Sequence, residues 1–96
     1  MLMYLVIYDI SSNLLRNRVA EVLKDYGLTR VQLSGFLGQL PRHRLNSLLA
    51  ELEKLLESSR AAGRKSIQVY PLCRSCFKAR VNLGDPPEVR EKPITV

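Results

Sequence analysis

One aspartate, Asp9, follows an apolar run near the start of the chain, and the helix expected directly after it carries Arg16 and Arg18. Magnesium takes oxygen ligands and keeps several waters, so one or two carboxylates and a substrate phosphate can hold it. A bound magnesium ion activates water and neutralises charge on a phosphoryl group. The pattern therefore indicates a magnesium-dependent phosphodiester site with Asp9 as metal ligand and catalytic residue.

A single carboxylate is a weak ligand set, and two readings of Asp9 stay open. A two-fold dimer that places Asp9 beside its symmetry mate would double the set. Alternatively, Asp9 caps the following helix or bonds the loop of Ser11 and Ser12, since Asp is a favoured capping residue.

Arginines supply the phosphate-binding half of this hypothesis. Arg30 opens the second expected strand, and arginine binds phosphate bidentately. A diffuse positive field surrounds these residues, and it suits contact with a nucleic-acid backbone better than base reading. Its members are Arg42, Arg44, Arg60, Arg64, Lys65, Arg74, Lys78 and Arg80.

The composition indicates one small basic domain. The chain has 96 residues and a net charge of +6, and its pI is about 9.8. Residues 85–96 carry −1 and residues 1–84 carry +7, so we expect a single domain over 1–84 and a C-terminal tail over 85–96. A basic body favours nucleic acid as a partner over an inert basic surface. A thin core is expected at this length, which a homodimer would offset.

Several classes of protein are excluded by missing motifs. No run reaches the roughly 18 apolar residues of a membrane helix, and the first ten residues look like a strand rather than a signal peptide. We therefore expect a cytoplasmic protein with no membrane partner. A phosphate-binding loop, a dinucleotide fingerprint and a Gly-x-Ser-x-Gly motif are also missing, and His43 is the only histidine.

The hydrophobic spacing predicts the elements that must position these residues. Strands are expected at 3–8, 30–37, 66–72 and 79–83, with a short turn or helix over 73–78. One helix follows residues 11–13 and stops at Gly27, and a leucine-striped helix runs from Pro41 to residues 58–63. Glycines 35 and 38 indicate a bulge or a close backbone approach.

We read this order as an α+β fold, a ferredoxin-like βαββαβ sandwich. It would have a four-stranded antiparallel sheet with the helices on one face. Residues 93–96 would add an extra C-terminal strand to another chain's sheet edge, or would fray.

Cys73 and Cys76 form a Cys-x-x-Cys pair. Such a pair is redox-active or half of a zinc site in other proteins. This chain has no second pair, although a dimer could pool four cysteines around zinc. We expect structural or incidental thiols.

Three stretches resemble a known family: Tyr-Leu-Val-Ile-Tyr-Asp-Ile at 4–10, Leu-Arg-Asn-Arg-Val-Ala at 15–20 and Gly-Leu-Thr-Arg-Val-Gln-Leu-Ser-Gly-Phe at 27–36. They are similar to CRISPR-associated protein two, a small endonuclease of CRISPR adaptation, as is Tyr-Pro-Leu at 70–72. The resemblance implies a ferredoxin-like homodimer in which each Asp9 faces its mate and shares a divalent metal such as Mg²⁺. It also implies a C-terminal strand that crosses to the partner's sheet.

The resemblance further implies an enzyme that cleaves single-stranded RNA, double-stranded DNA or both, and that pairs with the CRISPR integrase in spacer acquisition and antiviral defence. Matched by motif, Tyr8 flanks the metal residue, and the residues that support activity or bind nucleic acid are Arg16, Arg18, Arg30 and Phe36. The alternative is a non-catalytic dimeric scaffold that bridges DNA and docks the integrase. A ligand-sensing regulatory domain of the same fold is disfavoured by the charge.

Overall fold

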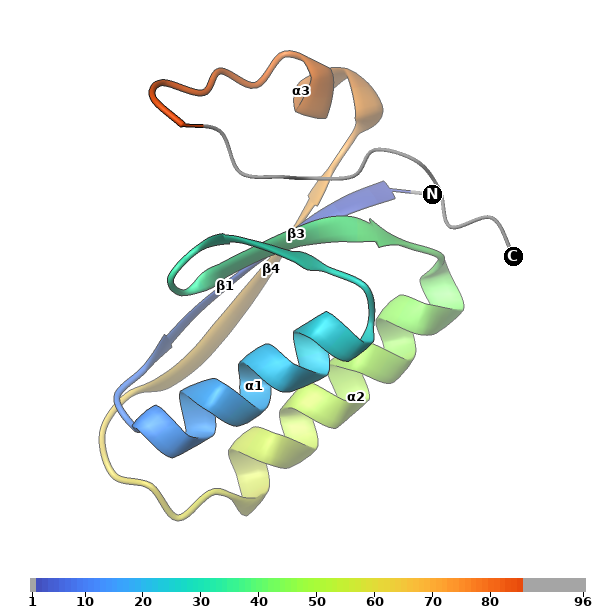
Figure 1. Ribbon diagram of the computed structural model, residues 1–96. Helices are drawn as coiled ribbons and strands as arrows, with labels where there is room; N and C mark the ends of the chain where they lie inside the picture. The colour runs from blue at the N-terminus through green and yellow to red at the C-terminus, as the bar shows by residue number, and fades with distance from the viewer. Residues whose placement is uncertain (1, 86–96) are drawn as a thin grey trace.

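The polypeptide alternates strands and helices in the order βαββαβ, followed by a short third helix (Figure 1). The computed structural model describes residues 2–85. Its elements are β1 (Leu2–Ile10), α1 (Asn13–Asp25), β2 (Thr29–Gln32), β3 (Gly35–Leu40), α2 (Arg42–Ser58), β4 (Lys65–Leu72) and α3 (Arg74–Lys78). This order confirms the ferredoxin-like α+β fold.

The four strands form one antiparallel sheet in the order β2-β3-β1-β4. β1 lies in the interior of the sheet, as its continuous apolar run predicts. Leu5 of β1 pairs with Leu37 of β3 on one side and with Tyr70 of β4 on the other. The end of β1 that carries Asp9 therefore has a fixed position relative to both neighbours.

The single strand expected over residues 30–37 is wrong, because this segment folds back as the β2–β3 hairpin. Leu33 and Ser34 form the turn, and Leu33 is 83% exposed. The alternation of apolar residues continues across the turn, which hid it from the sequence.

Both glycine signals in this hairpin are confirmed. The register shifts between Arg30 and Gln32, opposite Gly35, which is a bulge. A Cβ at Gly38 would lie 3.1 Å from the Cα of Leu28, so the close approach of the two backbones favours glycine there.

The strand expected over residues 79–83 is also wrong. Ala79 is the C-cap of α3, and the next residues form no strand. Val81 and Leu83 are 80% and 91% exposed. Their alternation imitates a strand, but β2 already completes the sheet. Residues 86–96, including the proposed terminal strand, lie outside the described residues.

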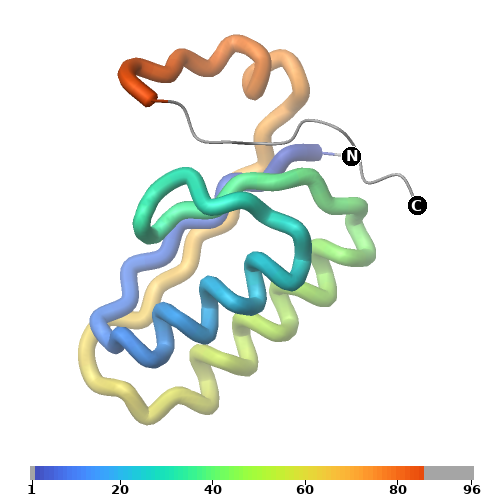
Figure 2. The backbone as a smooth tube through the Cα atoms, in the orientation of Figure 1, coloured from blue at the N-terminus to red at the C-terminus, as the bar shows by residue number. Residues whose placement is uncertain are grey.

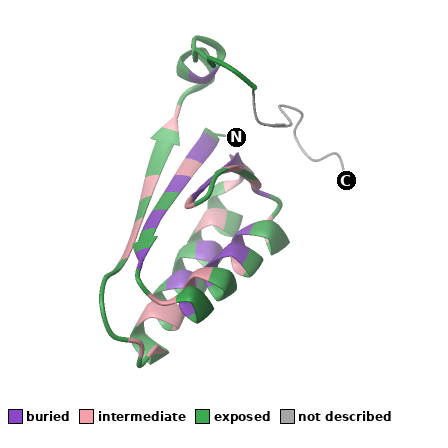
Figure 3. Ribbon diagram, turned by 60° about the vertical axis from the view of Figure 1, so that its left-hand side comes forward, coloured by how far each residue is buried: buried purple, intermediate pink, exposed green. Residues whose placement is uncertain are grey.

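The main core lies between α1 and α2 and one face of the sheet (Figure 3). Alternate residues of β1 point into it, and the helices contribute the stripes that their spacing predicts. The buried members include Tyr4, Val6, Tyr8 and Ile10 from β1, Leu15, Val19 and Leu23 from α1, and Leu48 and Leu52 from α2. The leucine stripe of α2 is core packing, as expected.

The opposite face of the sheet carries the other residues of β1. At one end α3 covers it, with Phe77 buried against Met3 and Leu37. Further along, Ile7 and Tyr70 are 40% and 45% exposed. We call this whole face of the sheet the open face.

The connection between α2 and β4 runs beside the turn between β1 and α1 (Figure 2). Ser11 N–H donates to the carbonyl of Arg64 at 3.0 Å, and Arg64 N–H donates to Ser11 Oγ at 2.9 Å. Gly63 has φ +92°, and a Cβ there would lie 2.6 Å from Ser11 Oγ. These contacts fix the connection against the Asp9 end of β1.

None of the helices within residues 2–85 combines the length and the apolar character needed to cross a membrane.

Candidate functional site

Asp9 lies at the end of β1 on the open face. Its backbone pairs with Ser66 of β4, and its side chain is 65% exposed. Arg64 donates from Nε to Asp9 Oδ2 at 2.6 Å. The capping alternative is wrong, because Ser12 Oγ accepts from Leu15 N–H at the start of α1. Asp9 is therefore an accessible carboxylate held by one ion pair.

The strand register explains why Arg64 reaches Asp9. Asp9 is opposite Ser66, and Arg64 precedes that residue by two positions, so its side chain is the diagonal neighbour on the same face. The sequence names Arg64 only as part of the diffuse field. Knowledge of the β1–β4 register would have singled it out, but antiparallel register was not readable from the strand patterns.

A cavity of about 180 Å³ lies at the turn of the β2–β3 hairpin, beside the start of α1. We call it the arginine pocket. Its lining residues are Tyr8, Arg16, Asn17, Arg30, Leu33 and Ser34. Two arginines and no carboxylate line it, so its chemistry favours an anion, and guanidinium groups match phosphate oxygens. Asn17 and Ser34 were missed as site residues, since neither has a distinctive spacing.

The backbone at the hairpin turn is held by two of the pocket's side chains. The carbonyl of Leu33 accepts from the Tyr8 hydroxyl at 3.3 Å and from Arg30 Nη1 at 3.2 Å. Tyr8 N–H also donates to the Ser34 carbonyl at 3.0 Å. The pocket is thus shaped before any ligand arrives.

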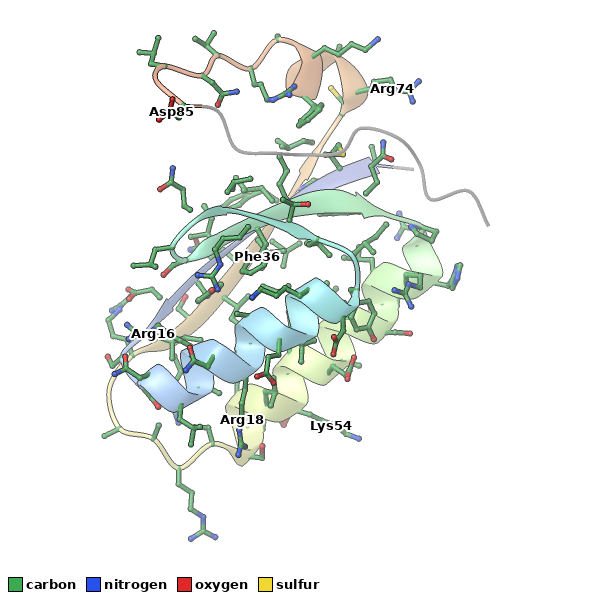
Figure 4. All side chains as sticks on the ribbon, viewed as in Figure 1. Arg16, Arg18, Phe36, Lys54, Arg74 and Asp85 are labelled. Carbon is green, nitrogen blue, oxygen red and sulfur yellow. The ribbon has the colours of Figure 1, made fainter. Side chains whose placement is uncertain are left out.

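Phe36 supports the pocket from beneath. It is fully buried between the sheet and α1 (Figure 4). The guanidinium carbon of Arg30 lies 5.1 Å from the Phe36 ring centroid, and the Tyr8 ring stacks at 6.3 Å. A cation above an aromatic face is attracted to it. Phe36 therefore positions Arg30 and Tyr8 and does not itself reach a ligand.

Tyr8 is in its neutral form at ordinary pH. Burial of the ring raises the pKa of its hydroxyl above the usual 10.0, and the positive charges of Arg30 and Arg16 oppose this only in part. A neutral hydroxyl keeps the one proton that it donates to the Leu33 carbonyl.

Arg18 lies away from the arginine pocket. Figure 4 shows Arg16 directed toward the hairpin and Arg18 toward the end of α2. Arg18 lines a separate hollow of about 300 Å³ with Ser58, Ser59 and Arg60. The structure therefore brings Tyr8, Arg16 and Arg30 together above Phe36, separates Arg18 from them, and places Asp9 on the other face of β1.

A comparison with protein families identifies the family to which this chain is related. Residues 1–80 match the model of the family described as CRISPR associated protein Cas2. The chain belongs to the Cas2 family. The resemblance in its N-terminal motifs is confirmed, and the match extends through β4 and α3.

Two similar Cas2 proteins cover most of the chain, and a fusion protein covers a shorter part of it. A CRISPR-associated endoribonuclease Cas2 of Pyrobaculum aerophilum is 33% identical over 93% of this chain and 94% of its own. One of Korarchaeum cryptofilum is 35% identical over 83% of this chain and 82% of its own. A Cas1/Cas2 fusion of Thermoproteus tenax is 37% identical over 59% of this chain and 22% of its own length.

A solved structure supports the fold. The crystal structure of a hypothetical protein from Thermus thermophilus superposes with a TM-score of 0.71 at 33% identity. The superposition covers 91% of this chain and 95% of that one.

This Cas2-family chain offers few ligands for a hydrated magnesium ion. Within residues 2–85, no three His, Cys, Asp or Glu side chains gather into a metal site. Asp9 is a hard oxygen ligand and is accessible, which suits an ion that keeps most of its waters. Arg64 is paired with the same carboxylate, so a cation would have to displace it.

Proposed function

We propose that this Cas2-family protein is a metal-dependent endonuclease that hydrolyses phosphodiester bonds of single-stranded RNA, double-stranded DNA or both. One observation carries the proposal. The exposed carboxylate of Asp9 adjoins Tyr8, which lines the arginine pocket on the other face of the same strand. The endoribonuclease names of its relatives support it.

The residues would divide the work between binding and chemistry. Arg16 and Arg30 would bind phosphate oxygens. The Tyr8 hydroxyl would keep the hairpin turn in place through its hydrogen bond to the Leu33 carbonyl. A nucleic-acid strand passing around the hairpin turn would then bring a neighbouring phosphate to Asp9. The Asp9 carboxylate would hold and orient the attacking water. Magnesium at Asp9 would supply charge neutralisation and lower the pKa of bound water.

A homodimer would complete the carboxylate set. Asp9 shares the open face with Ile7 and Tyr70, whose exposed side chains offer apolar surface for a second copy. Packing two open faces would bring the two Asp9 side chains near each other. Two close carboxylates repel unless a cation or a shared proton lies between them, so the dimer would favour metal binding.

We place this activity in CRISPR adaptation and antiviral defence, with the CRISPR integrase as partner. The fusion of Cas1 and Cas2 in one chain of Thermoproteus tenax supports this pairing. Size-exclusion chromatography of this protein mixed with the integrase tests the pairing, and we expect the two to elute together.

The nuclease proposal is tested with purified protein, labelled RNA and labelled duplex DNA. We expect cleavage with Mg²⁺, loss of cleavage with a chelator, and loss in Asp9→Ala. Asp25→Ala is the matched control, because it removes an exposed carboxylate at the end of α1 with the same change of charge. Equal cleavage by the wild type and Asp9→Ala would assign the activity to a contaminant or to another site.

A second candidate function is a non-catalytic scaffold that bridges DNA and docks the integrase. The ion pair between Asp9 and Arg64 favours it, because a carboxylate engaged by arginine is a poor metal ligand. Spacer integration with Asp9→Ala separates the two functions. Retained integration supports the scaffold, whereas lost integration supports catalysis.

A further inference from the structure

The two cysteines lie together at the start of α3, where the chain leaves β4. Cys73 is the N-cap of this helix, and Cys76 follows three residues later. Both are free and exposed, so they fill no core position. α3 lies across the sheet from α1 and α2 (Figure 1), and the nuclease proposal gives these thiols no role.

Their geometry is that of a reactive pair. The two sulfurs are 3.1 Å apart, in hydrogen-bond contact. The hydroxyl of Ser75 lies 3.2 Å from the Cys73 sulfur, and Cys76 N–H donates to that sulfur at 3.4 Å. All three groups converge on Cys73. Once Cys73 has lost its proton, each of them can donate to the thiolate.

The pKa values of the two thiols shift in opposite directions, as the convergence on Cys73 predicts. Hydrogen bonds from Ser75 and then from the Cys76 side chain lower the pKa of Cys73 from 9.0 to about 7. The neighbouring Cys73 raises the pKa of Cys76. An attacking thiol works best with a pKa near ambient pH. At neutral pH one thiol is ready to attack and the other stays protonated.

We propose that Cys73 and Cys76 form a redox-active dithiol that reacts with small disulfides of the glutathione type. The Cys73 thiolate attacks one sulfur of the disulfide, forms a mixed disulfide and releases one thiolate. Cys76 then attacks the Cys73 sulfur, releases the second thiol and gives up its own proton to it. One protein dithiol is oxidised to one disulfide, and one small disulfide is reduced to two thiols.

The reaction needs little movement of the chain. A disulfide requires a sulfur separation of about 2.0 Å, so the two side chains must close by roughly 1 Å. A structural metal is the competing use of such a pair. Among residues 2–85, no third His, Cys, Asp or Glu joins these thiols.

The redox state of the pair would affect how firmly α3 packs on the open face of the sheet. Cys76 directly precedes Phe77, which is 4% exposed and packs on Met3 and Leu37. Arg80 stacks on the Phe77 ring at 3.7 Å and donates to its carbonyl at 2.8 Å. A disulfide would fix the first turn of α3 and hold Phe77 on the sheet.

The test treats the full chain with glutathione disulfide at pH 7 and follows intact mass after acid quenching. We expect the wild type to lose two hydrogens with no lasting adduct. Cys76→Ser should accumulate one glutathione on Cys73, and Cys73→Ser should react more slowly. A pKa of about 7 instead of 9.0 raises the thiolate fraction about fiftyfold but lowers nucleophilicity, which leaves roughly a fivefold faster rate.

Other outcomes would overturn the proposal. They are equal rates for the two serine variants, a wild type that keeps both thiols, disulfides formed only between chains, and thiols protected by a co-purified zinc ion. Circular dichroism confirms that each variant is folded, which we expect because both side chains are exposed. The readout involves no nucleic acid, so it is independent of the nuclease proposal.

Discussion

Arg64 donates from Nε to Asp9 Oδ2 at 2.6 Å, and the two residues are 55 positions apart in the sequence. This ion pair joins the loop before β4 to the end of β1 and occupies the carboxylate that a cation would use. Both side chains are well exposed, so the pair is worth roughly 0–1 kcal/mol. A magnesium ion or a phosphate can therefore break it.

Arg64→Ala should make the protein more sensitive to magnesium. Removing the competing cation frees the carboxylate, and a pair worth at most about 1 kcal/mol corresponds to a two- to fivefold lower magnesium concentration at half-maximal cleavage. The measurement is a magnesium titration of RNA cleavage. Arg60→Ala is the control, since Arg60 is an exposed arginine of the same connection. A higher magnesium requirement in Arg64→Ala would show instead that Arg64 holds substrate.

Phe36→Leu should weaken nucleic-acid binding, and it should also lower stability because Phe36 is fully buried. Leucine keeps an apolar side chain in the core but removes the ring beneath Arg30, a contact worth about 0.5–1 kcal/mol at an exposed site. We expect a two- to fivefold weaker affinity for RNA in fluorescence anisotropy.

Phe77→Leu is the matched control, because Phe77 is a buried phenylalanine on the opposite face of the sheet. Urea unfolding reports the stability of both variants. An equal loss of affinity in the two variants would show that Phe36 does not support the arginine pocket.

Ionisation of Tyr8 should lower the free energy of unfolding at high pH. Burial raises the pKa of its hydroxyl in the folded protein above the usual 10.0. The corresponding stability is fully present below pH 10 and is lost as the pH rises through the folded-state pKa. Tyr8→Phe removes this titration.

The free-energy difference between the wild type and Tyr8→Phe should therefore stay constant from pH 6 to 9. It should then shift against the wild type above pH 10. Urea unfolding at each pH measures it. A difference that changes between pH 6 and 9 would contradict the assignment of a neutral Tyr8 hydroxyl.

The sequence predicted what depends on local periodicity. The alternation in β1, the stripe through Leu15 and Val19, and the leucines of α2 each specify an element and the face that it buries. It failed where a turn lies inside an unbroken apolar pattern, as at Leu33 and Ser34. It failed again at residues 79–83, where the same pattern occurs without a sheet neighbour.

The site was predictable only in part for a related reason. The motifs brought Tyr8, Arg16 and Arg30 forward, and the fold does assemble them around one cavity. The pairing of Asp9 with Arg64 depends on strand register, a tertiary property that spacing along the chain does not encode. The separation of Arg16 from Arg18 was readable from the expected helix, because residues two apart on a helix point to different sides.

Ile7→Glu should separate the proposed dimer and lower its activity. Ile7 is 40% exposed on the open face, two residues before Asp9. A buried, unpaired charge in an apolar interface costs several kcal/mol. We expect a shift from dimer to monomer in analytical ultracentrifugation and a parallel loss of magnesium-dependent cleavage, since each monomer keeps only one carboxylate.

Leu14→Glu is the control for this change, because Leu14 is 64% exposed on α1, away from the open face. It adds the same charge and should leave both the sedimentation and the cleavage unchanged. A dimer that survives Ile7→Glu but dissociates in Leu14→Glu would move the interface from the sheet to the helices. In that case the two Asp9 carboxylates could not meet across the open face, and the shared metal site would be excluded with it.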